Sequence, residues 1–183
     1  MNIVHLSGFV SDVTSKEFSW GLAVQLKFEQ EGFRTYIDVG NIKKGDNSLD
    51  RVQALKGKHV ALEAKLKSRK GKPSEQYPDP KTWYSVATSP GGAKAVSQAL
   101  TGWGSNSCCF AGKILEARDV NGTHFLKVGI SFFNPSAQDY GQWEVRVKCV
   151  QGLVPPTEGS VVVVGTVYAD NGVAVEATQV FAP

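Results

Sequence analysis

The chain has 183 residues, of which 42% are hydrophobic and 20% charged, and this apolar content excludes a protein that is disordered throughout. Its length allows one medium domain or two small domains. The net charge of +3 is unevenly divided, with 15 Lys and Arg against 10 Asp and Glu in residues 1–102 and 5 against 7 in residues 103–183. A polyanionic partner would therefore be drawn to the first half.

The first part of the chain contains three runs in which apolar and polar residues alternate, which predicts β-strands over residues 4–10, 22–28 and 33–39. The alternation assigns the inward positions of the second and third strands to Leu22, Val24, Leu26, Phe28, Thr35, Ile37 and Val39. It assigns the outward positions to Ala23, Gln25, Lys27, Arg34, Tyr36 and Asp38. We therefore expect Phe28 to lie in the core and Tyr36 to be exposed.

The segment 46–57 predicts a short helix. Asp46 or Ser48 can cap its first turn and Gly57 can end it. The apolar residues that share one helical face are Leu49, Val52 and Leu55. The runs HVALEAKL and TWYSVAT then predict a fourth and a fifth strand that form a closing hairpin with a basic loop between them.

An internal repeat becomes visible when the chain is laid on itself with a shift of 104 residues. VHLSGFV then falls on CCFAGKI, and LAVQLKF falls on LKVGISF without a gap. Gly8 matches Gly112, and Phe28 matches Phe132. A shift of 102 further along pairs Gly57 with Gly159. We interpret the chain as two copies of one unit of about 80–100 residues.

Between the two copies, the segment 91–102 (GGAKAVSQALTG) is interpreted as a linker that can form two or three helical turns. In the second copy the helix position is taken by QGLVPPTEG, whose two prolines exclude a regular helix. Its closing hairpin contains Asn171-Gly172, which predicts a tight two-residue turn. The long basic loop of the first copy therefore has no counterpart in the second.

Five strands with a helix or loop between the third and fourth are the arrangement of the OB-fold. The sequence accordingly predicts an all-β protein of two tandem five-stranded OB-fold barrels, joined by a short linker that can be helical. The first OB-fold domain is predicted at residues 1–90, the linker at 91–104 and the second domain at 105–183.

The first copy resembles the bacterial single-stranded DNA-binding protein family and its primosomal relatives. VHLSGFVSDV is similar to the opening strand of that family, FRTYIDV to its central strand, and LKGKHVALEAKLKSRKG with WYSV to its closing hairpin. The similarity covers residues 1–90 well and 107–181 loosely. The resemblance implies binding of single-stranded DNA and places Tyr36 where the family has a stacking tryptophan.

The resemblance also bears on assembly. Cellular members of the family carry a flexible tail with an acidic tip that recruits partner proteins, whereas this sequence stops at QVFAP, so recruitment through such a tip is not expected. Members with two OB units in one chain tend to pair as dimers with four units. The resemblance therefore implies a homodimer.

A binder of single-stranded nucleic acid needs cations for the phosphates and exposed rings for the bases. The stretch 65–85, KLKSRKGKPSEQYPDPKTWYS, supplies both, although a basic loop can also serve solubility alone. We expect this loop to be mobile when free and ordered on DNA. The candidates of the first copy are Lys16, Phe18, Trp20, Lys27, Arg34, Tyr36, Lys67, Arg69, Lys70, Lys72, Tyr77 and Trp83.

The second copy has fewer candidates, because its loops are shorter. Trp143 is placed at the position of Tyr36 in the repeat, but it shares an alternation phase with Val145 and Val147, which favours burial. Trp20 and Trp83 are left open between base stacking and closing an end of a barrel. Phe133 is a further exposed-ring candidate, and the cations that could contact phosphates are Arg118, Lys127, Arg146 and Lys148.

Catalytic and metal-binding signatures are not found in the sequence. His5, His59 and His124 lie in separate segments without cysteine or carboxylate neighbours at ligand spacing. A phosphate-binding loop, a nucleophile elbow and a dinucleotide fingerprint are also absent from the sequence. We therefore predict a protein that is not an enzyme and uses no metal or cofactor.

The three cysteines, Cys108, Cys109 and Cys149, form neither a disulfide framework nor a paired zinc spacing, which favours a reducing compartment. The N-terminus does not resemble a signal peptide, and no apolar stretch approaches the roughly 18 residues of a spanning helix. We expect a cytoplasmic, nucleoid-associated protein without a membrane partner. A phage or plasmid origin would suit the missing tail.

The leading hypothesis is binding of single-stranded DNA with low sequence specificity, in replication, recombination or repair. The first alternative is an OB-fold adaptor whose barrels contact replisome or primosome proteins, which the charge of −2 in the second half would suit. A second alternative is RNA binding, because contacts to the 2′-hydroxyl cannot be read from a sequence. Carbohydrate binding and catalysis come last, because a fold does not fix a function.

Overall fold

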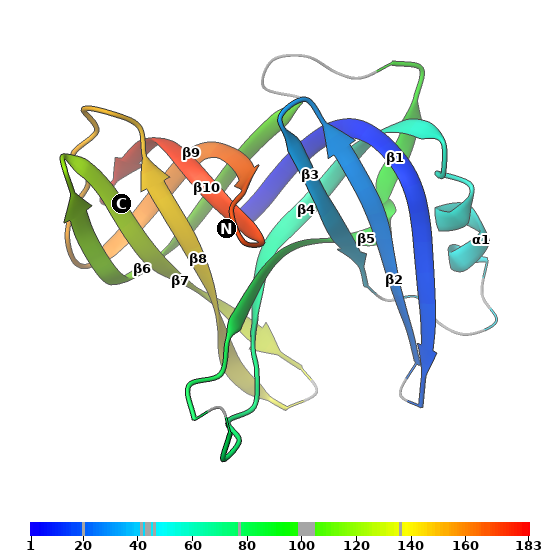
Figure 1. Ribbon diagram of the computed structural model, residues 1–183, viewed down its shortest axis with the longest axis horizontal. Helices are drawn as coiled ribbons and strands as arrows, with labels where there is room; N and C mark the ends of the chain where they lie inside the picture. The colour runs from blue at the N-terminus through cyan, green and yellow to red at the C-terminus, as the bar shows by residue number, and fades with distance from the viewer. Residues whose placement is uncertain are drawn as a thin grey trace. The chain divides into compact units, whose positions relative to one another are not determined.

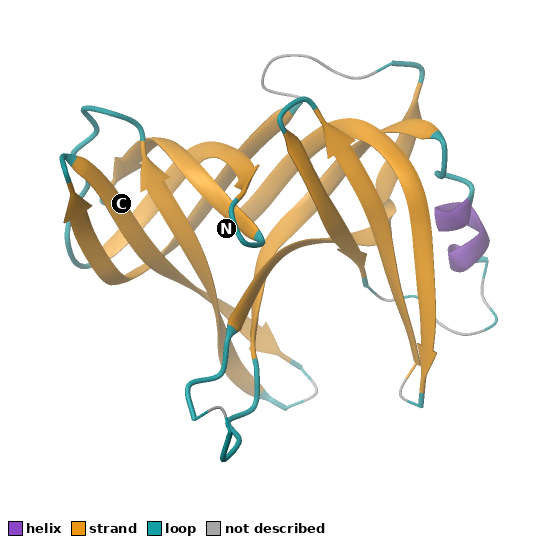
Figure 2. Cartoon of the chain, in the orientation of Figure 1, coloured by secondary structure: helices purple, strands orange, loops and turns teal. Residues whose placement is uncertain are grey.

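The computed structural model describes residues 1–19, 21–40, 42, 45, 47–76, 78–98, 105–135 and 137–183. Strands make up most of this part of the chain, and its one α-helix is short (Figure 2). Within the described residues, no helix is both long enough and apolar enough to cross a membrane.

The first five strands close into an N-terminal barrel (Figure 1). Neighbouring strands follow the order β1-β2-β3-β5-β4, and β4 pairs with β1. The pairing of β3 with β5 is parallel, and α1 lies between β3 and β4 in the chain. This is the strand order of the OB-fold, and it confirms the predicted all-β OB-fold class. The elements are β1 (Asn2–Phe18), β2 (Gly21–Gln30), β3 (Phe33–Val39), α1 (Ser48–Gln53), β4 (Lys58–Lys70) and β5 (Thr82–Val96).

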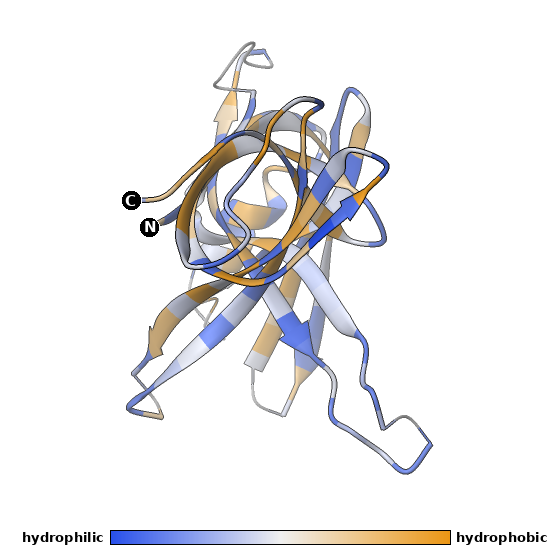
Figure 3. Cartoon of the chain, turned by 90° about the vertical axis from the view of Figure 1, so that its left-hand side faces the viewer, coloured by the Kyte–Doolittle hydropathy of each residue, from blue (hydrophilic) through white to orange (hydrophobic). Residues whose placement is uncertain are grey.

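The last five strands repeat this order as a C-terminal barrel. They are neighbours in the order β6-β7-β8-β10-β9, β6 pairs with β9, and the β8–β10 pairing is parallel. In Figure 3 apolar and polar residues alternate along many of the strands, as expected where one face of a strand is buried. The elements are β6 (Asn106–Val120), β7 (Thr123–Asn134), β8 (Asp139–Cys149), β9 (Ser160–Ala169) and β10 (Val173–Phe181).

The first strand of each barrel approaches the second strand closely at a glycine. A Cβ at Gly8 would lie 2.5 Å from the carbonyl oxygen of Glu29 and 2.6 Å from the ring of Phe28. Gly112 is placed in the same way against the carbonyl oxygen of Gly129. A register shift follows each glycine, between Val10 and Asp12 in β1 and at the equivalent place in β6. Both strands thus approach their neighbour closely and then bulge at the same point.

The predicted helix is present as α1, where Val52 is fully buried. Its N-cap residue is Asn47, which makes no side-chain capping hydrogen bond, and Ser48 is the first helical residue. The alternative cap Asp46 lies outside the described residues. Gly57 has a φ of +75°, as expected for a glycine that follows a helix. Residues 150–159 of the second barrel contain no helix, in agreement with their two prolines.

Two expectations about connections are wrong. Residues 91–96 continue strand β5 instead of beginning a helical linker, because this segment remains paired within the sheet. Residues 99–104 lie outside the described part of the chain. In the last hairpin Ala169 pairs with Val173, so the turn contains three residues and not two. Asn171 and Gly172 both have positive φ in this turn.

The residues group by contacts into two compact units that are not continuous in sequence. The N-terminal unit comprises residues 3–65 and 86–108, and the C-terminal unit comprises residues 1–2, 66–85 and 109–183. The arm, defined here as residues 66–85, contains the end of β4, the basic loop and the start of β5. Although the arm includes the ends of two strands of the N-terminal barrel, it is grouped by its contacts with the C-terminal unit.

The strand alternation expected from the sequence is confirmed at five of the seven inward positions of the N-terminal barrel, whereas Leu22 and Thr35 are only half-buried. Val24, Leu26, Phe28, Ile37 and Val39 are buried in the core, and Phe28 has no exposed surface. The core of the C-terminal barrel contains Phe110, Val128, Val145, Val147 and Val175, among others. These inward residues leave the opposite faces of the same strands for solvent and ligands.

Candidate nucleic-acid interface

The outer face of β2 and β3 carries an exposed ring beside a lysine. Tyr36 is 51% exposed and is the direct cross-strand partner of Lys27, which is also exposed. Directly opposite residues in an antiparallel pair have side chains about 5 Å apart at Cβ. No ion pair involves Lys27 in the described part of the chain. A cation and a ring are therefore available together on this face.

The neighbouring pairs on this face are polar. Gln25 Nε2 donates a hydrogen bond of 2.8 Å to Asp38 Oδ1. Arg34 Nε lies 3.8 Å from a carboxylate oxygen of Glu29, and the arginine side chain is 82% exposed. An ion pair this exposed is weak and salt-sensitive. Arg34 can thus exchange the carboxylate for a phosphate at small cost.

The sequence predicts that Lys16 and Phe18 lie in the loop between the first two strands, but both lie on strand β1, because β1 pairs with β2 as far as the pair Phe18 and Gly21. The Nζ atom of Lys16 lies 5.2 Å from the ring centroid of Phe18, which is 38% exposed. The hairpin end therefore presents a second ring with a cation beside it. Trp20, the third candidate at this hairpin, lies outside the described residues.

Most of the basic arm residues also lie on a strand. Lys67, Arg69 and Lys70 belong to β4, whereas Lys72 and Lys81 lie in the loop that follows. Arg69, Lys70 and Lys72 are exposed, and none of them takes part in an ion pair among the described residues. Tyr77 lies outside the described residues. The strand fixes the spacing of these cations along the arm.

Trp83 lies at the start of β5 and is 51% exposed. Its ring lies against Gly71, where an added Cβ would be 3.1 Å from the indole. The backbone N–H of Gly71 donates a 3.1 Å hydrogen bond to the carbonyl oxygen of Lys81. These contacts hold the indole at the base of the loop with half its surface open.

Three contacts anchor the arm within the C-terminal unit. The N–H of Glu144 donates a 2.7 Å hydrogen bond to Ser68 Oγ. Lys67 Nζ lies 5.6 Å from the ring centroid of Trp143, and the guanidinium of Arg146 lies 4.5 Å from the ring centroid of Tyr84. The basic residues of the arm are therefore presented by the C-terminal unit, a pairing of distant segments for which the sequence carries no local signal.

The alignment of Trp143 with Tyr36 is wrong by one residue. Leu26 pairs with Ile37 in the first barrel, and its repeat equivalent Ile130 pairs with Trp143 in the second. Trp143 thus corresponds to the inward Ile37, and a one-residue change of register moves a side chain to the other face. In agreement, Trp143 is half-buried and stacks on Phe132, with centroids 4.0 Å apart and an interplanar angle of 15°.

The candidate cations of the C-terminal barrel are paired with carboxylates. Lys127 Nζ lies 3.0 Å from Glu116, which also contacts Arg118, and Lys148 Nζ lies 3.2 Å from Glu176. The hydrogen bond from Lys127 holds the pKa of Glu116 below its ordinary value, and the same contact raises the pKa of Lys127. These lysines are less available for phosphate than Lys27.

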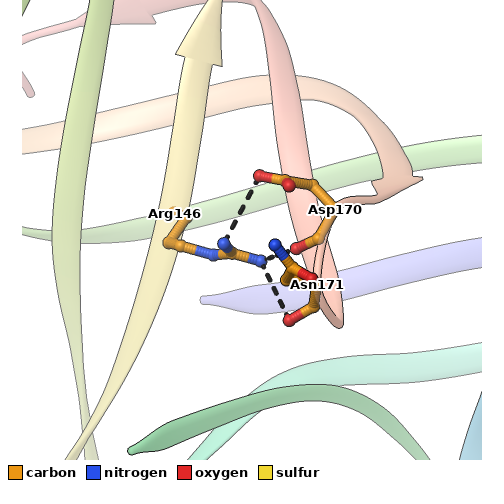
Figure 4. A network of polar contacts seen from close by, with 3 residues as sticks. All are labelled: Arg146, Asp170 and Asn171. Atoms are coloured by element: carbon orange, nitrogen blue, oxygen red, sulfur yellow. Dashed lines mark hydrogen bonds and ion pairs between the residues drawn. The ribbon is translucent and has the colours of Figure 1, made fainter.

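Arg146 makes more polar contacts than these two lysines do (Figure 4). Its guanidinium lies 3.3 Å from the carboxylate of Asp170 and donates hydrogen bonds to the carbonyl oxygens of Asp170 and Asn171. The ring of Tyr84 also contacts the guanidinium, whose Nε atom is buried without a hydrogen-bond partner among the described residues. We therefore find Arg146 to be a structural contact between β8, the β9–β10 turn and the arm.

A pocket of about 390 Å³ lies beside Arg146 in the C-terminal unit. Phe125, which is 37% exposed, lies in its wall. Burial and the nearby carboxylate of Asp170 raise the pKa of Tyr168, which also lines the pocket. The lining carries cations and carboxylates in nearly equal number, so its charges largely cancel.

Two exposed rings at the end of the β7–β8 hairpin form another feature. Phe133 pairs with Tyr140 across the hairpin, and their rings meet edge to face with centroids 5.3 Å apart. Tyr140 is 74% exposed and was not among the residues that the sequence singled out. Its position opposite Phe133, once the hairpin register is known, is the signal that identifies it.

Metal-binding clusters are not found in the described residues, since no three His, Cys, Asp or Glu side chains gather there. His124 Nδ1 lies 3.4 Å from Asp119, which is an isolated pair.

Comparison with known proteins identifies the fold. No protein-family model matches the chain, and no curated protein matches it either. Among solved structures, a single-stranded DNA-binding protein from Thermus aquaticus superposes with a TM-score of 0.69, at 16% sequence identity. The chain shares the fold of this protein. The match covers 100% of this chain and 93% of the Thermus chain, so it includes both barrels.

Proposed function

We propose that the protein binds single-stranded DNA with low sequence specificity. The observation that carries the proposal is the exposed pair Tyr36 and Lys27 on the outer β2–β3 face of an OB barrel. OB-folds hold oligonucleotides on the corresponding strands. A ring offers stacking to any base, and a lysine offers charge to any phosphate, so neither contact selects a sequence. The likeness to the Thermus DNA-binding protein supports the same function.

The arm supports the proposal with a second cationic segment. Arg69, Lys70 and Lys72 are exposed and unpaired within the described residues, and Trp83 presents an open indole nearby in the chain. We propose that these cations contact phosphates and that Trp83 stacks on a base. The role of Trp20 and Tyr77 in binding is proposed from the sequence alone.

We further propose that the chain represents two OB units in tandem, that it forms a homodimer with four barrels, and that it acts on DNA in replication, recombination or repair. The glycine and bulge shared by β1 and β6 support the duplication. A molecular mass measured by light scattering at micromolar concentration tests the dimer. The proposed location is the cytoplasm, in association with the nucleoid.

The proposed function is tested by fluorescence anisotropy with three labelled ligands of equal length, which are oligo-dT, an RNA and a DNA duplex, at two salt concentrations. Preferential binding of oligo-dT that weakens with salt supports the proposal. Tighter binding of the RNA would assign the same surface to RNA. Failure to bind any of the three would overturn the proposal.

A second candidate function is that of an adaptor for replication proteins, and one observation favours it for the C-terminal barrel. Three of its candidate cations, Lys127, Arg146 and Lys148, are each paired with a carboxylate, which reduces the positive charge that they offer to phosphates. Interfaces between proteins accept such balanced charge more readily than a phosphate track does. The adaptor role would become the leading function if no nucleic acid bound.

A further inference from the structure

Trp143 is the middle layer of a three-residue stack in the C-terminal unit. The ring of Phe132 lies 4.0 Å from its centroid and nearly parallel to it, and Lys67 Nζ lies 5.6 Å from the same centroid. Because Phe132 fills one face at stacking distance, we assign the lysine to the opposite face. The indole is therefore held between an aromatic ring and a cation.

Phe132 and Lys67, the two neighbours of the Trp143 ring, differ in how strongly their side chains are fixed. Phe132 lies opposite Gly141, where an added Cβ would be 2.5 Å from the Phe132 ring, so the absent side chain makes the room for this ring. Lys67 ends a flexible four-carbon chain and has no ion pair among the described residues. The contact of a partly solvated lysine with an indole is weaker than the stacking of a base on a ring. The lysine is the layer that a ligand can displace.

We propose that Trp143 is a base-stacking site and that Lys67 acts as its guard, which means that it covers the free face of the indole until a ligand displaces it. A phosphate draws the ammonium off the ring, a base takes its place on the indole, and Phe132 supports the indole from behind. This inference rests on the proposed function. It differs from stacking on Tyr36, because Trp143 lies at an inward register position and an arm lysine lies over its ring.

A hydrogen bond between β4 and β8 keeps Lys67 close to Trp143 during this exchange. The hydrogen bond from the N–H of Glu144 to Ser68 Oγ joins the residue after Lys67 to the residue after Trp143. A phosphate held by Lys67 therefore remains within one side-chain length of the indole, which suits a nucleotide whose own base stacks there. Binding exchanges one partner of the ring and leaves the β4–β8 contact in place.

The test uses a chain in which Trp143 is the single tryptophan, made by changing Trp20, Trp83 and Trp103 to Phe. Anisotropy of labelled oligo-dT reports binding, and tryptophan emission reports Trp143. We expect strong quenching at saturation by oligo-dT and a much smaller change with an abasic strand of equal length, which has phosphates but no bases. Saturation by oligo-dT without a change in emission would overturn the inference while leaving the proposed function intact.

Substitutions in the otherwise native chain give an independent readout, which decides the question if the triple variant does not bind. Trp143→Leu should weaken oligo-dT binding by about 5- to 150-fold, whereas Trp143→Phe, which keeps a ring, should lose much less. Equal affinities of both variants and the native chain, with lowered melting temperatures, would show a purely structural tryptophan. Absence of oligo-dT binding by the native chain would instead be a failure of the proposed function.

A matched pair of lysine variants tests the guard. In the chain with Trp143 as its single tryptophan, Lys67→Met should alter the emission of the free protein, because it removes the cation from the indole. Lys70→Met removes an equal charge from an exposed position on the same strand and should leave that emission unchanged. Identical emission from both variants would overturn the assignment of Lys67 as the guard.

Discussion

Tyr36 is exposed because it occupies an outward position of β3 between residues that face inward or lie at the edge of the core. Replacing it by Ala should weaken oligo-dT binding by about 1–3 kcal/mol, the range for a ring that stacks on a base. The melting temperature should change little, since half of the side chain is already in solvent. Titrations by anisotropy and thermal unfolding measure the two effects.

The control for this variant is Tyr36→Phe, which keeps the ring and should retain most of the affinity. A lower melting temperature of Tyr36→Ala with unchanged affinity would assign Tyr36 to the packing of the barrel and remove it from the binding surface.

Gly8 is required by the close approach of β1 to β2. In Gly8→Ala the new Cβ would meet the carbonyl oxygen of Glu29 at 2.5 Å, and a backbone atom cannot swing aside as a side chain can. Overpacking of this kind costs about 1–3 kcal/mol of unfolding free energy. Urea denaturation measures it, and Gly91→Ala is the control because nothing lies within 4 Å of a Cβ there. Equal stability of the two variants would contradict the predicted clash.

The ion pair of Glu116 with Lys127 makes stability depend on pH in acid. The pKa of Glu116 is lower in the folded protein than its ordinary value of 4.5, so its contribution is present above about pH 4.5 and is lost as the pH falls through the folded pKa. In Glu116→Gln the difference in urea midpoint between about pH 7 and about pH 3 should be smaller than in the native chain. Glu31→Gln, at an exposed position outside such a pair, should leave that difference unchanged.

At the scale of an element, we expect the cations of the arm to contribute to the salt dependence of DNA binding. Each cation that neutralises a phosphate on a single strand contributes about 0.7 to the slope of log affinity against log salt. Neutralising Lys67, Arg69, Lys70 and Lys72 together should therefore flatten the slope by about 2 to 3, with similar loss for every base composition. The matched control is Lys148→Gln, whose lysine is already paired with Glu176 and should change the slope much less. A native slope and affinity in the quadruple variant would identify the arm as a solubilising segment.

The strands could be predicted from the sequence because a buried face imposes alternation on each strand by itself. The failure at Trp143 arose where two strands must be aligned with each other. The β2–β3 loop contains two residues and the β7–β8 loop contains four, and these two extra residues shift the repeat from 104 to 106. An insertion of two residues leaves inward residues facing inward, so Ile37 corresponds to Trp143. The register of a hairpin depends on the length of its loop, and the alternation within each strand does not reveal that length.

At the scale of the whole molecule, the predicted site residues divide by what each one contacts. Tyr36, Lys27 and Trp83 are exposed as their local pattern allows. Lys127 and Lys148 pair with carboxylates of neighbouring strands, and Arg146 pairs with Asp170 in the β9–β10 turn. Lys67 lies over the ring of a tryptophan 76 residues away in the chain. Composition identifies the cations, but only tertiary contacts decide which of them remain free.

The interleaving of the two units in sequence has a consequence for dividing the gene. A break within residues 99–104 would place strands β1–β5 on one fragment and β6–β10 on the other. The arm would then be on the first fragment, and its partners Trp143, Glu144 and Arg146 would be on the second. Neither fragment would encode a complete unit. We expect the two fragments to bind each other when they are co-expressed, as halves of a split reporter protein do, and a charge-neutralised arm with Ser68→Ala to weaken that reassembly.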